Sequence, residues 1–150
     1  MKPLNKYKIA VVICLFGMFI SGCEKETPPV VIYPEFPHPN WEVSPDNGFS
    51  VSMTAVVKLN KALVADFRAE DPVGAFAGEE CRGIGQVVRD SLIFISIHGK
   101  PDETLNIQFR YYSTLTKHMF ITEPNLPFIP NESYGSTENP VELDLKIVEK

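Results

Sequence analysis

Apolar and polar side chains alternate strictly along three stretches of this chain. The stretches are Phe49–Leu59, Leu105–Tyr112 and Val141–Ile147. A period of two places one face of a strand in a core and the other in solvent, which is typical of antiparallel sheet. The run Leu92–Ile97 is apolar on both faces, so we expect it to be a central strand. Shorter strand candidates are residues 62–67, 73–77, 84–89 and 117–122.

Turn-forming residues separate these candidate strands, at positions 60–61, 90–91, 99–102 and 113–116. About seven to nine short strands with this spacing predict an all-β fold, an antiparallel β-sandwich with an immunoglobulin-like arrangement. The stretch 60–71 is compatible with a short helix as well as with a strand. The alternation of Leu63, Ala65 and Phe67 favours the strand.

The first residues have the pattern of a secretory signal. Lys2, Lys6 and Lys8 precede an uncharged apolar run, Ile9–Ile20. As a helix this run extends about 18 Å, short of a bilayer core of about 30 Å. A positive segment followed by a short apolar run is typical of a signal peptide rather than of a membrane-spanning helix.

The apolar run ends in ISGC, residues 20–23, which resembles the lipobox of bacterial lipoprotein signal peptides. The resemblance implies that residues 1–22 are removed and that Cys23 is lipidated. Two or three acyl chains hold a protein on a membrane stably, whereas one binds marginally. Glu24 and Glu26 resemble the signal that sends lipoproteins of Bacteroidetes-type bacteria to the cell surface. An ordinary signal peptide or an N-terminal anchor helix is the alternative.

Proline determines the character of the segment that follows. Residues 23–47 hold six of the 13 prolines. Proline fixes φ and lacks an N–H donor, so this segment is neither a helix nor a central strand. We expect an extended tether over residues 23–47, able to lie along the domain around Tyr33 and Trp41, and a β-sandwich domain over residues 48–150. The protein is then expected at the outer membrane, lipid-anchored and displayed at the cell surface.

Charge and cysteine content narrow the classes of function. The formal net charge is −5, and the removal of three lysines with residues 1–22 leaves 11 basic against 19 acidic residues, a net charge of −8. An acidic protein repels phosphate-rich partners, so nucleic acid is not expected as a partner. Cys14 leaves with the signal peptide and Cys23 takes the lipid, so Cys81 has no disulfide partner in the chain.

The sequence DFRAEDPVGAFAGEECRGIG, residues 66–85, concentrates glycines and charged residues. Gly78 and Gly83 have the spacing of a phosphate loop, but Ile84 follows where such a loop needs lysine. Glycine supplies positive φ and close backbone approach at bends and bulges. We therefore interpret the stretch as a β-hairpin with residues 78–83 as its connection.

Carboxylates in the same stretch are candidate metal ligands. Oxygen donors of this kind suit Ca²⁺, and the candidates are Asp66, Asp71, Glu79 and Glu80. No ligand spacing organises them, and Arg68 and Arg82 offer surface ion pairs as the alternative. Cys81 has no histidine in a motif with it, which favours a small, partly buried side chain over a nucleophile.

Five segments occur in a characteristic order, namely MTAVVKLN (53–60), DPVGAFAGEECRGIG (71–85), LIFISIHG (92–99), LNIQFRYYS (105–113) and NPVELDL (139–145). Together they resemble a small β-sandwich module common in secreted and lipid-anchored proteins of Bacteroidetes. Its hallmark is similar to Asp-x-Val-Gly-Ala-Phe followed by Glu-Cys-Arg-Gly. The resemblance implies adhesion or accessory binding and no catalytic residues. Lys61 stands where such modules often have glycine, so we expect that turn to differ.

Aromatic side chains are candidates for ligand binding. Flat rings beside acids and amides suit glycans, and the candidates are Trp41, Tyr112 and Tyr134. The alternative is that each ring packs a loop onto the sandwich. Ser91, in the sequence Asp-Ser-Leu at residues 90–92, resembles the short Asp-Ser/Thr-aliphatic sequence that Bacteroidetes O-glycosylate.

These observations predict a non-catalytic binding or adhesion module, held on the membrane by its N-terminal lipid and contacting a glycan or an envelope protein. A structural or accessory subunit of a larger outer-membrane complex is the alternative. A hydrolase is disfavoured because the sequence organises neither a nucleophile with a base nor a pair of carboxylates. No cofactor is expected apart from the Ca²⁺ that the acidic residues suit.

Overall fold

The computed structural model describes residues 31–89 and 91–149, which form an all-β fold. Its strands are β1 (Val51–Lys58), β2 (Val73–Ala77), β3 (Glu80–Arg89), β4 (Leu92–Gly99), β5 (Asn106–Tyr112), β6 (Met119–Ile121), β7 (Leu126–Pro127), β8 (Ser133–Tyr134), β9 (Val141–Glu142) and β10 (Lys146–Ile147). The helical elements are a 3-10 turn, η1 (Pro45–Asn47), and a short helix, α2 (Lys61–Val64). The predicted fold class is confirmed.

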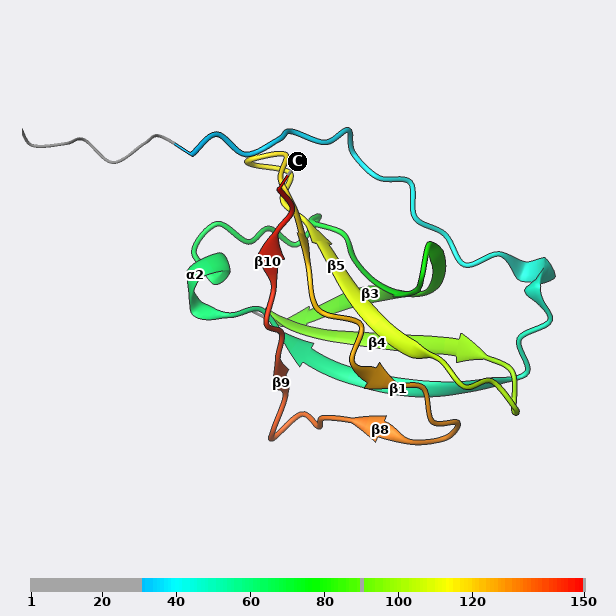
Figure 1. Cartoon of the computed structure of the whole chain (residues 1–150). Helices are drawn as coiled ribbons and strands as arrows, with labels where there is room; N and C mark the ends of the chain where they lie inside the picture. The colour runs from blue at the N-terminus through cyan, green and yellow to red at the C-terminus, as the bar shows by residue number, and fades with distance from the viewer. Residues whose placement is uncertain (1–30, 90, 150) are drawn as a thin grey trace, which may run out of the picture. The chain divides into compact units, whose positions relative to one another are not determined.

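Strand pairing joins these elements into one sheet (Figure 1). The order is β10-β6-β5-β2-β3-β4-β1-β8, with β7 paired to β5 and β9 to β1. All pairs are antiparallel except that β8 and β9 run parallel to β1. Strand β4 lies between β3 and β1, which confirms the central position predicted from its two apolar faces.

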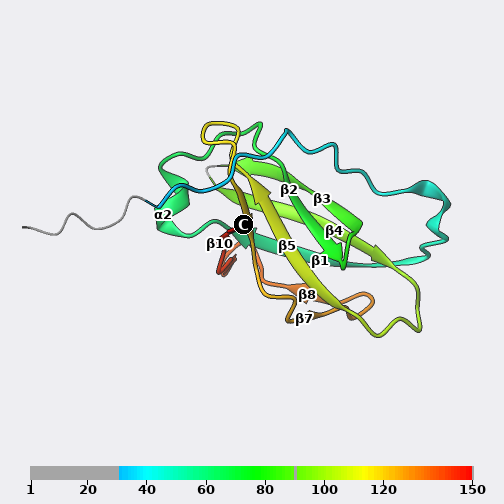
Figure 2. The same ribbon diagram turned by 45° about the horizontal axis from the view of Figure 1, so that its top comes forward.

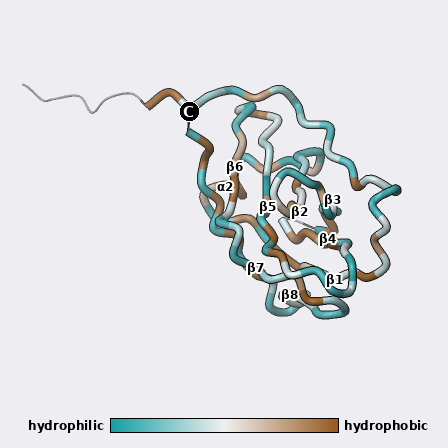
Figure 3. The backbone as a smooth tube through the Cα atoms, turned by 45° about the vertical axis from the view of Figure 1, so that its right-hand side comes forward, coloured by the Kyte–Doolittle hydropathy of each residue, from teal (hydrophilic) through white to brown (hydrophobic). Residues whose placement is uncertain are grey.

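The sheet curls so that β5 crosses over β4 and β1 (Figure 1). Phe109 of β5 stacks on Tyr134 of β8, with 6.4 Å between ring centroids and 14° between ring planes. The core between the two ends of the sheet is filled by the inward side chains of three strands: Met53, Ala55, Val57, Ile93, Ile95, Ile97, Ile107, Phe109 and Tyr111. The two layers of the predicted sandwich therefore belong to one continuous sheet, along which hydrophobic and hydrophilic segments are interspersed (Figure 3).

Strand β3 changes partner along its length (Figure 2). Its first half, residues 80–84, pairs with β2, and its second half, residues 85–89, pairs with β4. Just before β3 passes from β2 to β4, a Cβ at Gly83 would lie 2.3 Å from the Ser96 carbonyl oxygen. Because only glycine lacks that atom, Gly83 permits the close approach of the two strands.

Two local predictions are wrong. The hairpin of β2 and β3 forms as predicted, but its connection is shorter than residues 78–83 because β3 begins at Glu80. The strand predicted over residues 62–67 begins instead as helix α2. The Asn60 side chain accepts a hydrogen bond from the Leu63 backbone N–H at 3.2 Å, and this helix cap outweighs a short alternation of apolar residues.

Residues 33–43 lie across the outer face of the sheet, opposite the core, and we call them the strap. The Tyr112 hydroxyl donates to the Phe36 carbonyl oxygen at 3.1 Å. Trp41 meets Phe76 of β2 edge-on, with 5.2 Å between ring centroids. The compact unit accordingly begins at Ile32, so the described part of the predicted tether packs on the strands from its first aromatic residues onward.

The C-terminal alternation predicted as one strand over residues 141–147 forms two short strands. Leu143 and Leu145, between β9 and β10, are buried. Strand β9 pairs with β1 and β10 pairs with β6, so this segment passes from one end of the sheet to the other and closes the curl. Among the described residues, no helix has the length and apolar character needed to cross a membrane.

Candidate functional site

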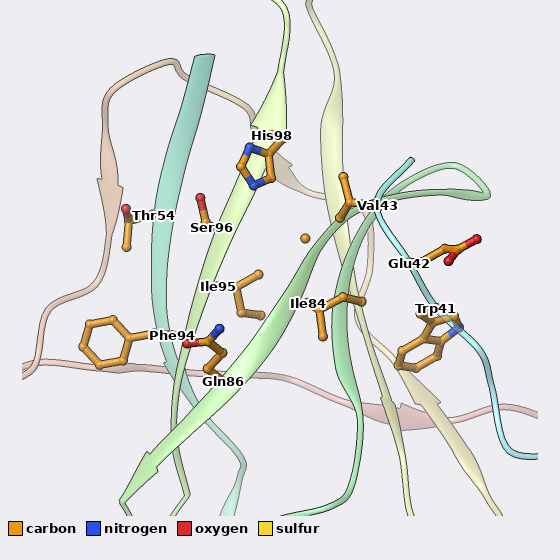
Figure 4. Close-up of a pocket in the computed structure, with 11 residues that line it drawn as sticks. Trp41, Glu42, Val43, Thr54, Ile84, Gln86, Phe94, Ile95, Ser96 and His98 are labelled. Atoms are coloured by element: carbon orange, nitrogen blue, oxygen red, sulfur yellow. The ribbon is translucent and has the colours of Figure 1, made fainter. Parts of the chain in front are cut away.

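An open groove of about 570 Å³ lies on the outer face of the sheet (Figure 4), and we call it the first groove. It occupies the place where β3 and β4 diverge, because these strands pair only as far as Gly85 and Ile95. The side chains that define it come from the strap, β3 and β4: Trp41, Ile84, Gln86, Phe94, Ser96 and His98.

The strand alternation sets which side chains reach the first groove. On β4, Ile93, Ile95 and Ile97 are fully buried in the core, so the residues between them project outward. On β3, glycines face β4 and the core, while Ile84 and Gln86 are exposed on the outer face. Figure 4 shows these two side chains between Trp41 on one side and Phe94 on the other.

The strap supplies the wall of the first groove opposite Phe94. Trp41 is half-buried over β2, where a Cβ at Gly74 would lie 3.3 Å from its ring atom Cε3. The missing side chain at Gly74 thus leaves room for the indole beside Phe76. Trp41 is the single tryptophan of the chain, and its ring presents a flat apolar surface to the groove.

A buried arginine fixes the end of the first groove. Arg82 is 6% exposed, and its Nη1 donates to Glu103 Oε2 at 2.8 Å and to the His98 carbonyl oxygen at 3.3 Å. Its guanidinium also pairs with Glu80 at 2.8 Å and lies 4.4 Å from the centre of the Phe49 ring. Arg82 therefore donates a hydrogen bond to a carbonyl oxygen of β4 at a position where β3 does not pair with that strand.

The contacts of Arg82 also affect the ionisation of Glu103. The hydrogen bond from Arg82 lowers the pKa of Glu103 below its ordinary value, with a further contribution from the Lys100 backbone N–H. The carboxylate thus stays charged and keeps Lys100 to Glu103 folded against the end of β4. Among the described residues, Arg82 Nε has no hydrogen-bond partner.

The first groove combines two aromatic rings with an amide, hydroxyls and an imidazole. Such a surface suits a saccharide, because sugar rings stack on aromatic faces while their hydroxyls need mixed donors and acceptors. Its open shape also fits an extended chain of sugar units rather than a small molecule enclosed on all sides. The lining also includes the carboxylate of Glu42 and the hydroxyl of Thr54.

Trp41 separates the first groove from a second groove of about 460 Å³. The second groove lies over β5 and β6, and its apolar lining comes from Phe36, Trp41, Met119, Ile121 and Val148. Arg110, Gln108 and Glu79 supply its polar groups. The Arg110 guanidinium lies 4.3 Å from the centre of the Phe76 ring.

The four candidate metal ligands do not form one site. Asp71 precedes β2 and Glu79 follows it, so their side chains lie at opposite ends of this strand. Glu79 pairs with Arg110 at 2.9 Å, and Glu80 pairs with Arg82. Among the described residues, no three His, Cys, Asp or Glu side chains gather in a way that holds a metal ion. The ion-pair alternative accounts for Glu79 and Glu80.

Asp71 belongs to a buried hydrogen-bond network. One carboxylate oxygen accepts from the Tyr111 hydroxyl at 2.8 Å and from the Arg68 backbone N–H at 3.0 Å. The other accepts from the Thr114 backbone N–H at 2.9 Å and from its hydroxyl at 2.6 Å. Burial, with the Asp71 carboxylate next, raises the pKa of Tyr111 well above its ordinary value. Asp66 is exposed on the neighbouring loop.

The three candidate ligand-binding rings have different environments. Trp41 lines both grooves. Tyr112 is 3% exposed and packs edge-on against His38 of the strap, so it is not the open stacking surface that was predicted. Tyr134 stacks on Phe109 and borders a small cavity of about 120 Å³. For Tyr112 and Tyr134, packing is the better description.

The remaining sequence candidates are placed as follows. Cys81 is buried, its thiol donates to the Gly83 carbonyl oxygen at 3.7 Å, and burial raises the pKa of the thiol. Ser91 lies in the turn before β4 and is half-exposed, and its glycosylation stays a prediction. Cys23 lies outside the described residues.

Sequence reasoning missed most of the residues that define the grooves. Phe94 stood within a run interpreted as apolar on both faces, although Ser96 and His98 at alternate positions after it indicate the outward side. Arg110 was counted only as an outward position of its strand. One signal was available in the alternation of glycine with larger residues from Gly83 to Gln86, because it leaves Ile84 and Gln86 on one face of β3.

Comparison with known protein-family models, with curated proteins and with solved structures gives no match for this chain.

Proposed function

We propose that this protein is a non-catalytic glycan-binding module, anchored by lipid at Cys23 and displayed on the outer membrane at the cell surface. The observation that carries the binding proposal is the first groove, where Trp41 and Phe94 border exposed polar side chains on an open sheet face. The lipid anchor is supported by the ISGC sequence at residues 20–23, and the location at the cell surface by Glu24 and Glu26, which follow it.

The non-catalytic part of the proposal is supported by Cys81 and by the ion pairs of Arg82. A cysteine nucleophile needs an accessible thiolate and a base. The Cys81 thiol is buried, and its pKa is raised by that burial. The Glu80 and Glu103 carboxylates are engaged in ion pairs with Arg82.

A glycan array probed with the full chain tests the binding proposal. We expect retention of a subset of saccharides, and a loss of affinity of about tenfold for Phe94→Ala and for Gln86→Ala. Val88→Ala is the matched control, because Val88 lies on the outer face of β3, next in the alternation after Gln86, but does not line the first groove. Retention of no saccharide, or equal retention by all three variants, contradicts the proposal.

The anchor is tested separately by metabolic labelling with palmitate. We expect label on the natural chain and none on Cys23→Ser. Label on both, or on neither, contradicts lipidation at Cys23 without affecting the groove.

An accessory subunit of an outer-membrane complex is the second candidate, and the exposed apolar side chains of β3 favour it. Val88 is 61% and Ile84 38% exposed, and exposed apolar side chains on one strand offer a surface for a partner protein. In this case Val88→Ala weakens capture of a stable envelope partner, while the saccharide array shows no retention. The same variant thus discriminates between the two candidates.

A further inference from the structure

The second groove differs from the first in its chemistry. Its walls are apolar side chains from the strap, β6 and the C-terminal segment, among them Phe36, Met119, Ile121 and Val148. Its cationic group is the guanidinium of Arg110, which projects outward from β5 and stacks over Phe76. An apolar wall beside one fixed arginine is a surface for a ligand with an apolar body and an anionic end.

Arg110 is held in a fixed orientation. Its Nε donates to Gln108 Oε1 at 3.2 Å, and its Nη2 donates to the Gly78 carbonyl oxygen at 2.7 Å. Together with the Phe76 ring below, these contacts fix the plane of the guanidinium without using the carboxylate. The side chain is 17% exposed, so its head is accessible from the groove.

Glu79 occupies the carboxylate position on Arg110. Its two oxygens accept from Nη1 at 3.0 Å and from Nη2 at 2.9 Å, the bidentate geometry in which arginine recognises carboxylates. The Glu79 side chain is 91% exposed and lies in the short turn between β2 and β3. An exposed ion pair of this kind contributes little, so another carboxylate can take the place of Glu79.

The geometry points to the second groove as a binding site for a carboxylate joined to an apolar chain or ring, whose carboxylate replaces that of Glu79 on Arg110. The apolar body of the ligand then lies against Met119, Ile121 and Val148. Burial of this apolar surface contributes binding free energy that the Glu79 carboxylate, which has no apolar body in the groove, does not provide. The two parallel N–H donors of the guanidinium favour a planar carboxylate, which accepts both hydrogen bonds, over an anion that accepts only one. This site is separate from the proposed glycan site and shares only the Trp41 ring with it.

Trp41 makes the inference measurable, because the single tryptophan reports on the groove by its fluorescence. The full chain in phosphatidylcholine nanodiscs is titrated with 4-phenylbutyrate, with its uncharged isostere 4-phenylbutanamide, and with acetate. We expect a saturable change in fluorescence with 4-phenylbutyrate, and binding at least about tenfold weaker for the amide and for acetate. Equal binding of 4-phenylbutyrate and the amide overturns the inference.

Two variants with opposite expected effects sharpen the test. Arg110→Gln removes the fork and loses the preference for 4-phenylbutyrate over the amide. Glu79→Gln removes the internal competitor and strengthens 4-phenylbutyrate binding by about threefold or more. Because Glu79 is almost fully exposed, its substitution should leave the fold intact. Glu79→Gln therefore tests the site even if Arg110→Gln disturbs the fold. Unchanged binding in Glu79→Gln overturns the inference.

Matched controls exclude an effect of net charge. Glu123→Gln breaks an exposed ion pair with Lys146, and Arg89→Gln removes an exposed arginine at the end of β3; neither residue lines the second groove. We expect both control variants to bind 4-phenylbutyrate as the natural chain does. A gain with Glu123→Gln equal to that with Glu79→Gln assigns the effect to overall charge and overturns the site. Gln86→Ala, which affects the proposed glycan site, leaves this titration unchanged.

Discussion

At the scale of single residues, two buried polar side chains connect loops to the sheet. Asp71 joins the segment before β2 to Tyr111 and to the turn after β5. Arg82 joins β3 to the turn after β4 through Glu103. A buried polar group costs free energy unless its partners are present, so each network stabilises only as a complete set.

The substitution Asp71→Asn tests the first of these networks. The amide keeps one acceptor, and in either orientation its donor hydrogens face a backbone N–H, that of Arg68 or that of Thr114, which also donates. We expect a loss of about 2 kcal/mol in the free energy of unfolding, measured by urea denaturation. Asp66→Asn, on the exposed loop nearby, is the control and changes stability by less than about 0.5 kcal/mol. Equal losses for the two variants contradict a special contribution of Asp71.

The Arg82–Glu103 pair predicts a dependence of stability on pH. The pKa of Glu103 in the folded state is lowered from its ordinary value of 4.5, chiefly by the hydrogen bond from Arg82. A lowered pKa means stabilisation that is present above 4.5 and is lost as the pH falls through the folded-state value. Urea midpoints measured from neutral pH down to about pH 3 should therefore fall less steeply in Glu103→Gln than in the natural chain. Identical slopes contradict the assignment.

At the scale of elements, the exchange of partners by β3 creates the first groove. Along the chain, β3 leaves β2 after Ile84 and pairs with β4 from Gly85 onward, so the outer face opens between β4 and the first half of β3. The sequence predicted the strands well, because their alternation is local. It did not predict the exchange, which depends on contacts between Gly83 and Ser96 across two strands.

Glycine substitutions test this exchange directly. A Cβ at Gly83 meets the Ser96 carbonyl oxygen at 2.3 Å, whereas at Gly78 nothing lies within 4 Å and the strain comes only from a φ of +61°. We expect Gly78→Ala to lower the free energy of unfolding by about 1 kcal/mol and Gly83→Ala by clearly more, because backbone must move. Thermal unfolding of the two variants gives the comparison. A smaller loss at Gly83 contradicts the tight crossing.

At the scale of the whole molecule, the strap completes the outer face of the sheet. Without residues 33–43, the Phe76 ring and the Tyr112 side chain lose their cover, and both grooves lose the Trp41 wall. Residues 31–44 form neither helix nor strand, as the proline content predicted, whereas residues 45–47 of the predicted tether form the 3-10 turn η1. The path of the strap could not be predicted from sequence, since Gly74 and Phe76, which receive the indole, lie far along the chain in a different element.

The strap is tested by comparing its two ends. Trp41→Ala removes the ring packed on Phe76, and we expect the free energy of unfolding to fall by about 2 kcal/mol. Tyr33→Ala removes only an edge contact with His118 at 5.9 Å between ring centroids, and about 0.5 kcal/mol is expected. Urea denaturation followed by far-UV circular dichroism serves for both. An unchanged stability in Trp41→Ala shows that the strap is not part of the fold.

The candidate site shows the same division between local and long-range information. The sequence identified Trp41, which lines both grooves, because aromatic residues in a proline-rich segment stand out locally. It could not separate Tyr112, which the strap covers, from an exposed ring, and it grouped Asp71 with Glu79 because they are close along the chain. In the fold a strand separates those two carboxylates, and each binds a partner from β5.

The most direct test of the central claim is a map of amide resonance shifts on the full chain, titrated with the strongest saccharide from the array. The claim predicts shifts concentrated on Ile84, Gln86, Phe94 and Ser96, together with the Trp41 indole N–H, all of which lie on the first groove. Shifts concentrated on another face of the molecule, or the absence of any saturable shift, would contradict it.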